Sequence, residues 1–397
     1  MLVGLVGKTN VGKTTFFSAA TLVEAERENR PFVTINPNEG VGYVRVESVC
    51  TEFGIRCQPK YGWCNGRYRY VPVKLLDVAG LVKGAHKGRG LGNKFLDDLR
   101  RASVNIIVVD ASGATDDEGN PVPPSTHNPL EDVLMVKEEF ALWVSSIIER
   151  ARSKIRGRIV AGSSVDAALH EVLSGLDIRR DVIKEVLTDL ALERSPLEWS
   201  DKQLLSFSRE VLRRGKPFVV AANKVDVPEA EGNLKKLREA LKESVVPVSA
   251  EAELILRKAA KAGLIRYEPG DDDFEIVDES KLTRAQLRAL ETIREKVLRK
   301  FGSTGVQETL ETAVYKVLRM KIVFPVENEM KLSDKDGNVL PDAILLPEGG
   351  TVKDLAEKIH SEIARKALYG IDVRNRRRIS LDHILSHRDV VKIVAAR

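Results

Sequence analysis

The residues with the clearest chemistry form a glycine-rich run at positions 7–14, which ends in Gly12-Lys13-Thr14 and fits the pattern G-x-x-x-x-G-K-[ST]. In this pattern backbone N–H groups converge on phosphate oxygens, and the following helix adds the positive end of its dipole. We expect Lys13 to neutralise the β- and γ-phosphates of a nucleotide and the Thr14 hydroxyl to bind Mg²⁺. The predicted phosphate-binding residues are Asn10, Val11, Gly12, Lys13, Thr14 and Thr15.

A second group of residues could complete a site for magnesium and the γ-phosphate. Asp77 closes an apolar run and is followed by Val78-Ala79-Gly80. We expect Asp77 to hold Mg²⁺ through water and the Gly80 amide to face the γ-phosphate. Thr34 lies in the long segment before the next strand, where a threonine can close over the metal and the γ-phosphate. The predicted metal-binding residues are therefore Thr14, Thr34 and Asp77, and Lys13, Thr34 and Gly80 are predicted to serve hydrolysis.

The base of the nucleotide is predicted from the motif Asn223-Lys224-Val225-Asp226. This motif follows the apolar run Phe218–Ala222. An aspartate at this place accepts two hydrogen bonds from the N1–H and the 2-amino group of guanine. Adenine would leave that carboxylate unpaired, a mismatch that can cost a factor on the order of 10⁴–10⁵ in discrimination. Ser249-Ala250, after the last strand of this series, could supply a backbone amide to guanine O6. The order of these motifs, each at the end of a predicted strand, predicts a guanine nucleotide.

The elements that must position these residues alternate between strands and helices. Leu2–Val6, Asn105–Ala111 and Pro217–Ala222 are continuous apolar runs, and Val245–Val248 is a shorter one. Such runs are typical of parallel strands covered on both faces. With helical stretches between them, they predict an α/β fold with a doubly wound, mostly parallel sheet.

Two regions depart from that alternation. Residues 113–129 indicate a long loop that opens an insert ending near Arg214, and apolar residues at helical spacing after Val133 predict a helical hairpin or bundle there. This insert could serve either of two roles. It could only pack against the nucleotide-binding domain, or it could bind a partner. Beyond a linker at residues 271–273, Thr283 can cap a helix running to about Lys300. From residue 321 the order strand, strand, helix, strand suggests a β-grasp, ubiquitin-like domain.

Composition limits the class of protein. The 397 residues are too many for one ordinary domain, and 43% hydrophobic with 30% charged residues can bury a core and remain soluble. No apolar run reaches the length of a bilayer crossing, and a net charge of +5 is too mild to indicate nucleic-acid binding by itself. Three cysteines, an odd number, argue against a secreted disulfide framework. We therefore expect a cytoplasmic protein with no membrane contact, and we expect it to be a monomer.

The switch motifs resemble those of a known family. Residues 31–38 (PFVTINPN), residues 77–86 (DVAGLVKGAH) and residues 90–93 (GLGN) are similar to the Obg-related GTPases, specifically their YchF-like branch. Residues 321–395, with ILLPEGGTV at 344–352, resemble a TGS domain. The resemblance covers nearly the whole chain and implies a GTPase of translation that contacts the ribosome. Many members of that branch have an altered guanine motif and prefer ATP. The motif at 223–226 is intact here, so we expect GTP, and residues 50–70 suggest an archaeal-type subgroup.

The sequence leaves two candidates for the group that assists hydrolysis. Many small GTPases place a water-orienting glutamine directly after the D-x-x-G motif, but this chain has Leu81 there. Asn10 matches an asparagine that binds K⁺ in some related GTPases, so K⁺ could raise the rate. His86 could instead position the water, or be a surface histidine on a mobile loop. Slow intrinsic turnover is expected with either residue.

Two further clusters are ambiguous. Cys50, Cys57 and Cys64 are evenly spaced, but structural zinc normally takes four ligands, and the chain has neither a fourth cysteine nor a histidine close by in sequence. We therefore prefer cysteines in a strand-rich excursion over a zinc site. The basic run at residues 374–378 is either a solvated face or a salt-sensitive contact for ribosomal RNA.

Together these observations predict a nucleotide-controlled GTPase associated with the ribosome. A nucleotide-gated RNA-binding or scaffolding protein with little turnover, and an ATPase, are the alternatives. The predicted domains are a split G domain at 1–112 and 215–268, a helical insert at 113–214, a helical linker at 269–320 and a TGS-like β-grasp domain at 321–397.

Overall fold

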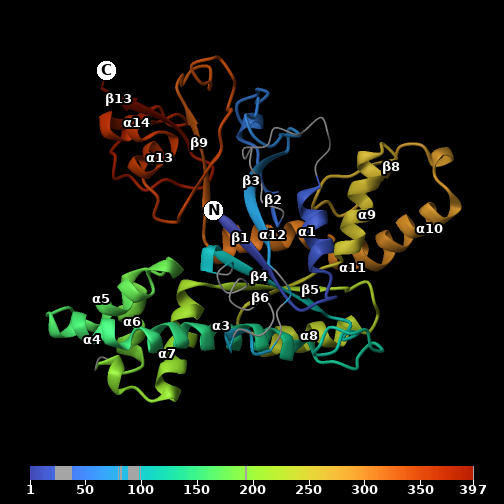
Figure 1. The fold of residues 1–397 in the computed structure, drawn as a ribbon. Helices are drawn as coiled ribbons and strands as arrows, with labels where there is room; N and C mark the ends of the chain where they lie inside the picture. Colours follow the sequence, from blue (N-terminus) through green and yellow to red (C-terminus); the bar gives the residue numbers. More distant parts are fainter. Residues whose placement is uncertain are drawn as a thin grey trace. The chain divides into compact units, whose positions relative to one another are not determined.

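A six-stranded sheet carries the motif residues at the ends of its strands (Figure 1). The computed structural model describes residues 1–22, 38–78, 80, 83–87, 98, 100–192 and 195–396. The strands are β1 (Leu2–Val6), β2 (Glu39–Glu47), β3 (Tyr68–Asp77), β4 (Val104–Asp110), β5 (Phe218–Asn223) and β6 (Ser244–Pro247). Their order in the sheet is β2-β3-β1-β4-β5-β6.

The central strands are parallel, as the sequence predicts. β1 pairs in parallel with both β3 and β4, and β5 pairs in parallel with both β4 and β6. Every residue of β4 and β5 is buried, which is why these strands are apolar runs without alternation. The carboxyl ends of parallel strands share one edge of a sheet, so this topology brings the motif residues together.

Helices cover both faces of this sheet (Figure 1). The helices next to it are α1 (Lys13–Thr21), α3 (Pro129–Arg150), α8 (Ala230–Ala240) and α9 (Ala250–Lys261). α3 and α8 lie on one face, and α1 and α9 pack together on the other. Phe140 of α3 and Leu237 of α8 join Ile107 and Val220 of the sheet in one hydrophobic core.

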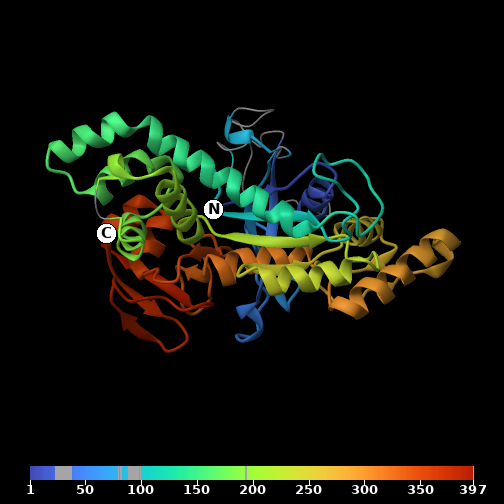
Figure 2. The same ribbon diagram turned by 90° about the horizontal axis from the view of Figure 1, so that it is seen from below.

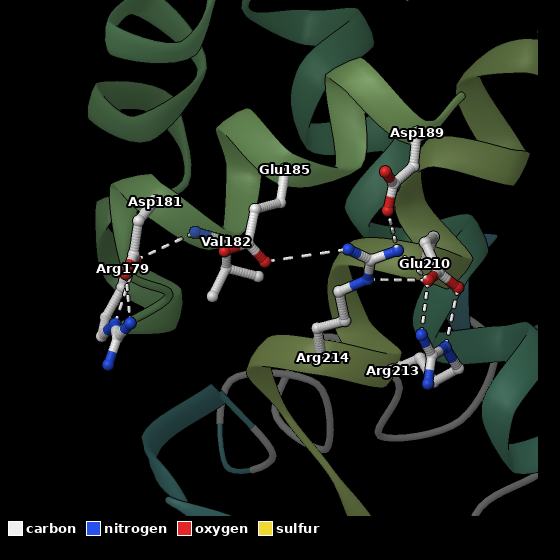
Figure 3. Close-up of polar contacts among 8 residues, drawn as sticks. All are labelled: Arg179, Asp181, Val182, Glu185, Asp189, Glu210, Arg213 and Arg214. Atoms are coloured by element: carbon white, nitrogen blue, oxygen red, sulfur yellow. Dashed lines mark hydrogen bonds and ion pairs between the residues drawn. The ribbon is translucent and has the colours of Figure 1, made fainter. Parts of the chain in front are cut away.

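The predicted helical insert is present, and α3 carries it away from the sheet (Figure 2). Its other helices are α4 (Arg152–Val160), α5 (Val165–Val172), α6 (Arg180–Asp189) and α7 (Asp201–Gly215), with 3-10 turns at Ser174–Leu176 and Pro196–Glu198. Ion pairs join α6 to α7 (Figure 3). Arg214 lies 2.7 Å from Asp189 and 2.7 Å from Glu210, and Glu210 also accepts a 2.6 Å bond from Arg213. The bond from Arg214 to Asp189 links α7 to α6, and the two bonds to Glu210 lie within α7.

The chain after α9 was predicted to be a linker followed by helices. Residues 271–273 instead lie in the loop of a small hairpin between β7 (Ile265–Arg266) and β8 (Glu275–Ile276). The prediction of Thr283 as a helix cap is confirmed, because its side chain accepts from the Gln286 amide. The helical elements here are a 3-10 turn at Glu279–Lys281, α10 (Arg284–Ile293), a π-helix at Arg294–Leu298, α11 (Arg299–Phe301), α12 (Val306–Glu311) and a π-helix at Thr312–Val317.

The C-terminal segment forms a second sheet, in the order β10-β9-β13-β11-β12. Its elements are β9 (Lys321–Val326), β10 (Ile344–Leu346), α13 (Val352–Ile359), α14 (Ser361–Lys366), β11 (Ala367–Asp372), β12 (Arg377–Ile379) and β13 (Val390–Ala395). β9 and β13 are parallel and the other pairs antiparallel.

Two features of this segment differ from the prediction. The order strand, strand, helix, strand omitted β11 and β12, because an antiparallel hairpin whose tip is a basic run shows no apolar alternation. The one helix of the predicted order is two helices, α13 and α14, because the backbone at His360 between them is extended (φ −167°) and the His360 side chain caps α14.

By its internal contacts the chain forms two units. Within the described residues, one unit takes in positions from 1–22, 36–40 and 74–309, and the other takes in positions from 41–73 and 310–397. The first contains the motif residues and the insert, and the second contains the C-terminal sheet with the three cysteines. The predicted four-part domain division stays a proposal.

Candidate nucleotide-binding site

The predicted phosphate loop connects β1 to α1. Gly12 has a φ of +88° immediately before α1, a left-handed conformation that favours glycine. A Cβ on Gly12 would lie 2.2 Å from Asn223 Nδ2, and a Cβ on Gly7 would lie 2.4 Å from the Val108 carbonyl oxygen. The glycines of the motif are thus required by close approach of neighbouring strand ends. The strand–loop–helix context that the pattern requires is present.

Lys13, Thr14 and Asp77 meet at the end of this loop. Lys13 Nζ lies 2.8 Å from Asp77 Oδ1, and Thr14 Oγ1 lies 3.4 Å from Asp77 Oδ2. A hydroxyl and a carboxylate at this separation provide the oxygen ligands that Mg²⁺ prefers, so Thr14 and Asp77 are the described residues that would hold the ion. Gly80 lies close by, since a Cβ on it would be 3.0 Å from Thr9 Oγ1. The third predicted metal ligand, Thr34, is outside the described residues.

The guanine motif lies at the end of β5, beside the phosphate loop. Asn223 is buried and donates from Nδ2 to the Val11 carbonyl at 2.9 Å, while its Oδ1 accepts from the Ala250 amide at 3.0 Å. Asp226 is exposed and receives a 2.7 Å hydrogen bond from Ser249 Oγ at Oδ1. Asn223 therefore joins the two loops, and Ser249 holds the Asp226 carboxylate, which the sequence predicts to bind the base.

The sequence suggests guanine O6 as the acceptor for a backbone amide of Ser249 or Ala250. In the structure both amides donate to groups of the protein instead. The Ser249 amide donates to the Thr304 carbonyl at 2.9 Å, and the Ala250 amide to Asn223. In this structure Ser249 supports the side chain of Asp226, and Ala250 supports that of Asn223. A direct bond from either amide to guanine O6 stays a prediction.

Asp110 is a site residue that the sequence analysis missed. Lys224, whose φ is +65°, places Nζ 2.8 Å from Asp110 Oδ2. The Asp110 carboxylate is buried and also accepts from the Ser112 and Thr115 hydroxyls. Burial acts to raise the pKa of Asp110, but the hydrogen bonds from Lys224, Ser112 and Thr115 outweigh it and hold this pKa below its ordinary value. An acidic residue at the end of the apolar β4 strand was the signal available in the sequence.

The loop at residues 113–128 packs on the phosphate loop. Lys8 is buried and lies 2.6 Å from Asp132 Oδ1, and His127 Nε2 lies 2.7 Å from the same oxygen. Asn10 donates from Nδ2 to the Gly119 carbonyl at 2.8 Å. The amide nitrogen of Asn10, the predicted K⁺ ligand, is thus engaged within the protein, and its Oδ1 is the atom that would bind a cation.

His86 is anchored to the neighbouring helix rather than displayed on a free loop. It lies in a 3-10 turn at Ala85–Lys87, and its Nδ1 is 2.7 Å from Glu139 Oε2 on α3. Glu139 also accepts from the Gly84 amide at 2.7 Å and the His86 amide at 3.1 Å. Burial acts to raise the pKa of Glu139, but these three hydrogen bonds outweigh it and lower the pKa. Glu139 was missed in the sequence because nothing local connects it to His86.

The basic run at residues 374–378 lies in the hairpin of β11 and β12, and much of it is paired. Arg374 lies 2.9 Å from Glu52, Arg377 lies 3.3 Å from Asp372, and the Arg378 guanidinium is 3.8 Å from the centroid of the Tyr369 ring. These contacts favour the interpretation of the run as a solvated face and leave Arg376, at the turn, as an exposed cation.

The fold and the site define a P-loop GTPase. Three family models match the chain: one described as 50S ribosome-binding GTPase over residues 2–137, one described as Obg-like GTPase YGR210-like, G4 motif-containing domain over residues 221–328, and one described as TGS domain over residues 335–395. In the described residues no helix is both long and apolar enough to span a bilayer.

Two GTP-binding relatives match the whole chain, and a third protein matches two thirds of it. An uncharacterised GTP-binding protein of Methanocaldococcus jannaschii is 46% identical, with 100% of this chain and 99% of that protein covered. The crystal structure of a GTP-binding protein from Pyrococcus horikoshii OT3 gives a TM-score of 0.79 at 39% identity and covers 100% of both chains. Obg-like ATPase 1 of Rattus norvegicus is 29% identical over 67% of this chain and 65% of its own length. The chain belongs to the Obg-like, YchF-type GTPases, and the resemblance predicted from its switch motifs is confirmed.

Proposed function

We propose that this protein binds GTP with Mg²⁺ at the phosphate loop, hydrolyses it slowly to GDP and phosphate, and uses the bound nucleotide as a switch. The observation that carries the choice of base is the Asp226 carboxylate, which Ser249 Oγ holds at 2.7 Å beside the buried Asn223. One carboxylate oxygen is fixed by this bond, and the carboxylate remains exposed for the N1–H and 2-amino group of guanine.

The residues of the chain have separate roles in this proposal. The backbone amides of residues 10–15 and the Lys13 ammonium bind the phosphates, and Thr14, Asp77 and Thr34 hold the metal. Mg²⁺, when bound, neutralises charge that develops on the phosphate oxygens. The Gly80 amide contacts the γ-phosphate. Leu81 cannot orient water, so turnover is slow unless another group assists.

Affinities for guanine and adenine nucleotides test which base the site binds. Calorimetric titration with GTP and GDP should give tight binding that weakens in Asp226→Asn, because the amide nitrogen of asparagine cannot accept from guanine. Titration with ATP and ADP is the control, and it matters because a relative bears the name Obg-like ATPase 1. A preference for ATP that survives Asp226→Asn would overturn guanine recognition and favour an ATPase.

Two candidates for the missing catalytic assistance follow from the site. K⁺ bound by Asn10 Oδ1 would supply positive charge near the phosphates, so replacing K⁺ by Na⁺ should lower the rate. His86, oriented by Glu139, would position water, so His86→Ala should lower turnover at unchanged nucleotide affinity. If neither change affects the rate, both residues are excluded from the hydrolytic step.

The proposed partner is the ribosome, which the protein meets as a cytoplasmic monomer. Support comes from the description of the family model for residues 2–137, 50S ribosome-binding GTPase. Ribosomes should therefore stimulate GTP turnover. If they bind in a nucleotide-dependent manner without stimulating turnover, the protein is a nucleotide-gated RNA-binding or scaffolding protein instead. Arg376→Glu should weaken the contact more at low than at high salt if the β11–β12 hairpin touches ribosomal RNA.

A further inference from the structure

The three cysteines of the chain converge within one irregular segment between β2 and β3. Cys50 lies in a 3-10 turn at Val49–Thr51, Cys57 in the chain that follows, and Cys64 at an isolated bridge with Arg69. Their Sγ atoms all lie within 4.8 Å of one another. Cysteine and histidine residues close by in sequence supply only three ligands, so the sequence alone favours no zinc site. The convergence itself could not be seen in the sequence.

The spacing of the sulfur atoms suits a tetrahedral metal ion. Cys50 Sγ and Cys64 Sγ are 3.9 Å apart. Four ligands placed tetrahedrally about zinc, with Zn–S bonds of about 2.3 Å, have sulfur atoms about 3.8 Å apart. A disulfide would require about 2.05 Å, and all three cysteines are free in this structure. Cys50 and Cys64 are therefore spaced as two thiolate ligands of one ion would be, and Cys57 Sγ lies within 4.8 Å of both.

Ser48 supplies an oxygen at the fourth corner. Its Oγ lies 2.8 Å from Cys50 Sγ, 3.3 Å from Cys64 Sγ and 3.9 Å from Cys57 Sγ. With metal–oxygen bonds of about 2.0 Å, the oxygen of a tetrahedral site would lie about 3.5 Å from each sulfur. One oxygen that contacts all three sulfurs is thus close to the position of a fourth ligand.

A buried cation beside the cluster balances its charge. Arg69 is 2% exposed, and its Nη atoms donate to the carbonyls of Leu340 and Pro341. Its Nε is buried without a hydrogen-bond partner. Three thiolates around a divalent ion carry a net charge of −1, which the Arg69 guanidinium would offset in a place where an unpaired charge is costly.

The cysteine-bearing segment is also hydrogen-bonded to the long loop before β10. Within the same unit, the Gln58 amide donates to the Val339 carbonyl at 2.7 Å and the Lys60 amide to the Pro341 carbonyl at 2.9 Å. These backbone bonds join residues 58–60 to the long loop before β10. Between Ser48 and Tyr68 the only regular element is one 3-10 turn, and turn hydrogen bonds such as that from the Ile55 amide to the Cys50 carbonyl hold parts of the path. A metal ion would add a link between its three cysteine-bearing stretches.

We propose that Cys50, Cys57 and Cys64 bind one zinc ion as thiolates, with Ser48 Oγ as the fourth ligand, and that the ion orders residues 48–69. Each cysteine releases its thiol proton to solvent when the ion binds. The site is structural rather than catalytic, because all four ligand positions are taken by the protein. It does not depend on the nucleotide proposed above.

The test is the metal content of the full chain, purified without a histidine tag, under reducing conditions and with zinc supplied. The wild type should retain about one zinc per chain after desalting, as structural sites do. Cys57→Ser and Cys64→Ser should each lower zinc to the background level, and Ser48→Ala should weaken retention against a chelator. Thr51→Ala is the matched control, since the Thr51 hydroxyl is in the same turn but donates to the Ser48 carbonyl. Its zinc content should equal that of the wild type.

A second measurement uses the wild type alone, in case the cysteine variants fold poorly. Cobalt(II) exchanged into the chain should give the intense visible absorption of a tetrahedral thiolate site. Chelation should speed amide exchange in residues 48–69, and added zinc should reverse it. A chain that takes up neither zinc nor cobalt overturns the proposal. Zinc retained equally by Cys57→Ser, or a disulfide between two of the cysteines in the native chain, overturns it as well.

Discussion

Glu139→Gln is the substitution that most directly probes how the turn containing His86 is held. Glu139 Oε1 accepts from the Gly84 amide, and Oε2 accepts from both the amide and the ring Nδ1 of His86. Glutamine keeps one oxygen and replaces the other by an NH₂ group, which cannot accept a hydrogen bond. If the glutamine amide oxygen takes the place of Oε2 beside His86, the bond from the Gly84 amide is lost. If the amide is turned the other way, the NH₂ group takes that place and both bonds from His86 are affected.

The cost can be worked out from these bonds. A hydrogen bond to a charged group is worth about 1.5–3 kcal/mol, and Glu139 is only 4% exposed, so solvent replaces little of what is lost. Losing one such bond should therefore raise the population in which residues 83–87 are detached by about 10- to 150-fold. Amide hydrogen exchange measured on peptides that cover this turn should accelerate by the same factor.

Glu138→Gln is the matched control. Glu138 is the preceding residue on α3 and makes an exposed ion pair with Arg209 at 2.8 Å, a kind of contact worth at most about 1 kcal/mol. Its substitution should leave exchange in residues 83–87 unchanged. Equal exchange in wild type and Glu139→Gln would refute the assignment of Glu139 as the anchor. Faster exchange with unaltered GTP turnover would keep the anchor but remove His86 from the hydrolytic step.

Three further substitutions have outcomes that follow from the structure. Gly12→Ala should abolish nucleotide binding measured by calorimetry, because its Cβ would lie 2.2 Å from Asn223 Nδ2 at a φ of +88°; undiminished affinity would contradict this. Lys8→Met should lower the free energy of unfolding in urea by less than the about 3–5 kcal/mol of a wholly unpaired buried charge, because the Asp132 carboxylate loses its ammonium partner but keeps the His127 ring at 2.7 Å, while the double variant Lys8→Met with Asp132→Leu should recover part of that loss. Hydrogen bonds from Arg213 and then Arg214 hold the pKa of Glu210 at about 2, below its ordinary 4.5, although partial burial opposes them. The stabilisation by Glu210 is therefore present above about pH 4.5 and lost as the pH falls through about 2. Unfolding of wild type and Glu210→Gln should thus differ by at most about 1 kcal/mol at neutral pH and converge in acid, and a difference that grows in acid would refute the sign.

The local parts of the candidate nucleotide site can be predicted from the amino-acid sequence. The glycines at 7 and 12, the lysine and threonine that follow, and the motif at 223–226 are read directly, because each motif is short and continuous in the chain. Apolar runs also revealed which strands are buried on both faces, and hence that the motifs share one edge of a parallel sheet. The helical insert followed from the spacing of its apolar residues.

The contacts between distant side chains, in contrast, become visible only in the folded chain. Glu139 is 53 residues from His86, and Lys224 is 114 residues from Asp110, so no pattern in the sequence relates the members of either pair. The same holds for β11 and β12, which are strands because they pair with each other, and for the three cysteines. Local motifs are fixed by the backbone geometry of a few consecutive residues, whereas these contacts depend on how whole elements pack, and packing is a property of the complete fold.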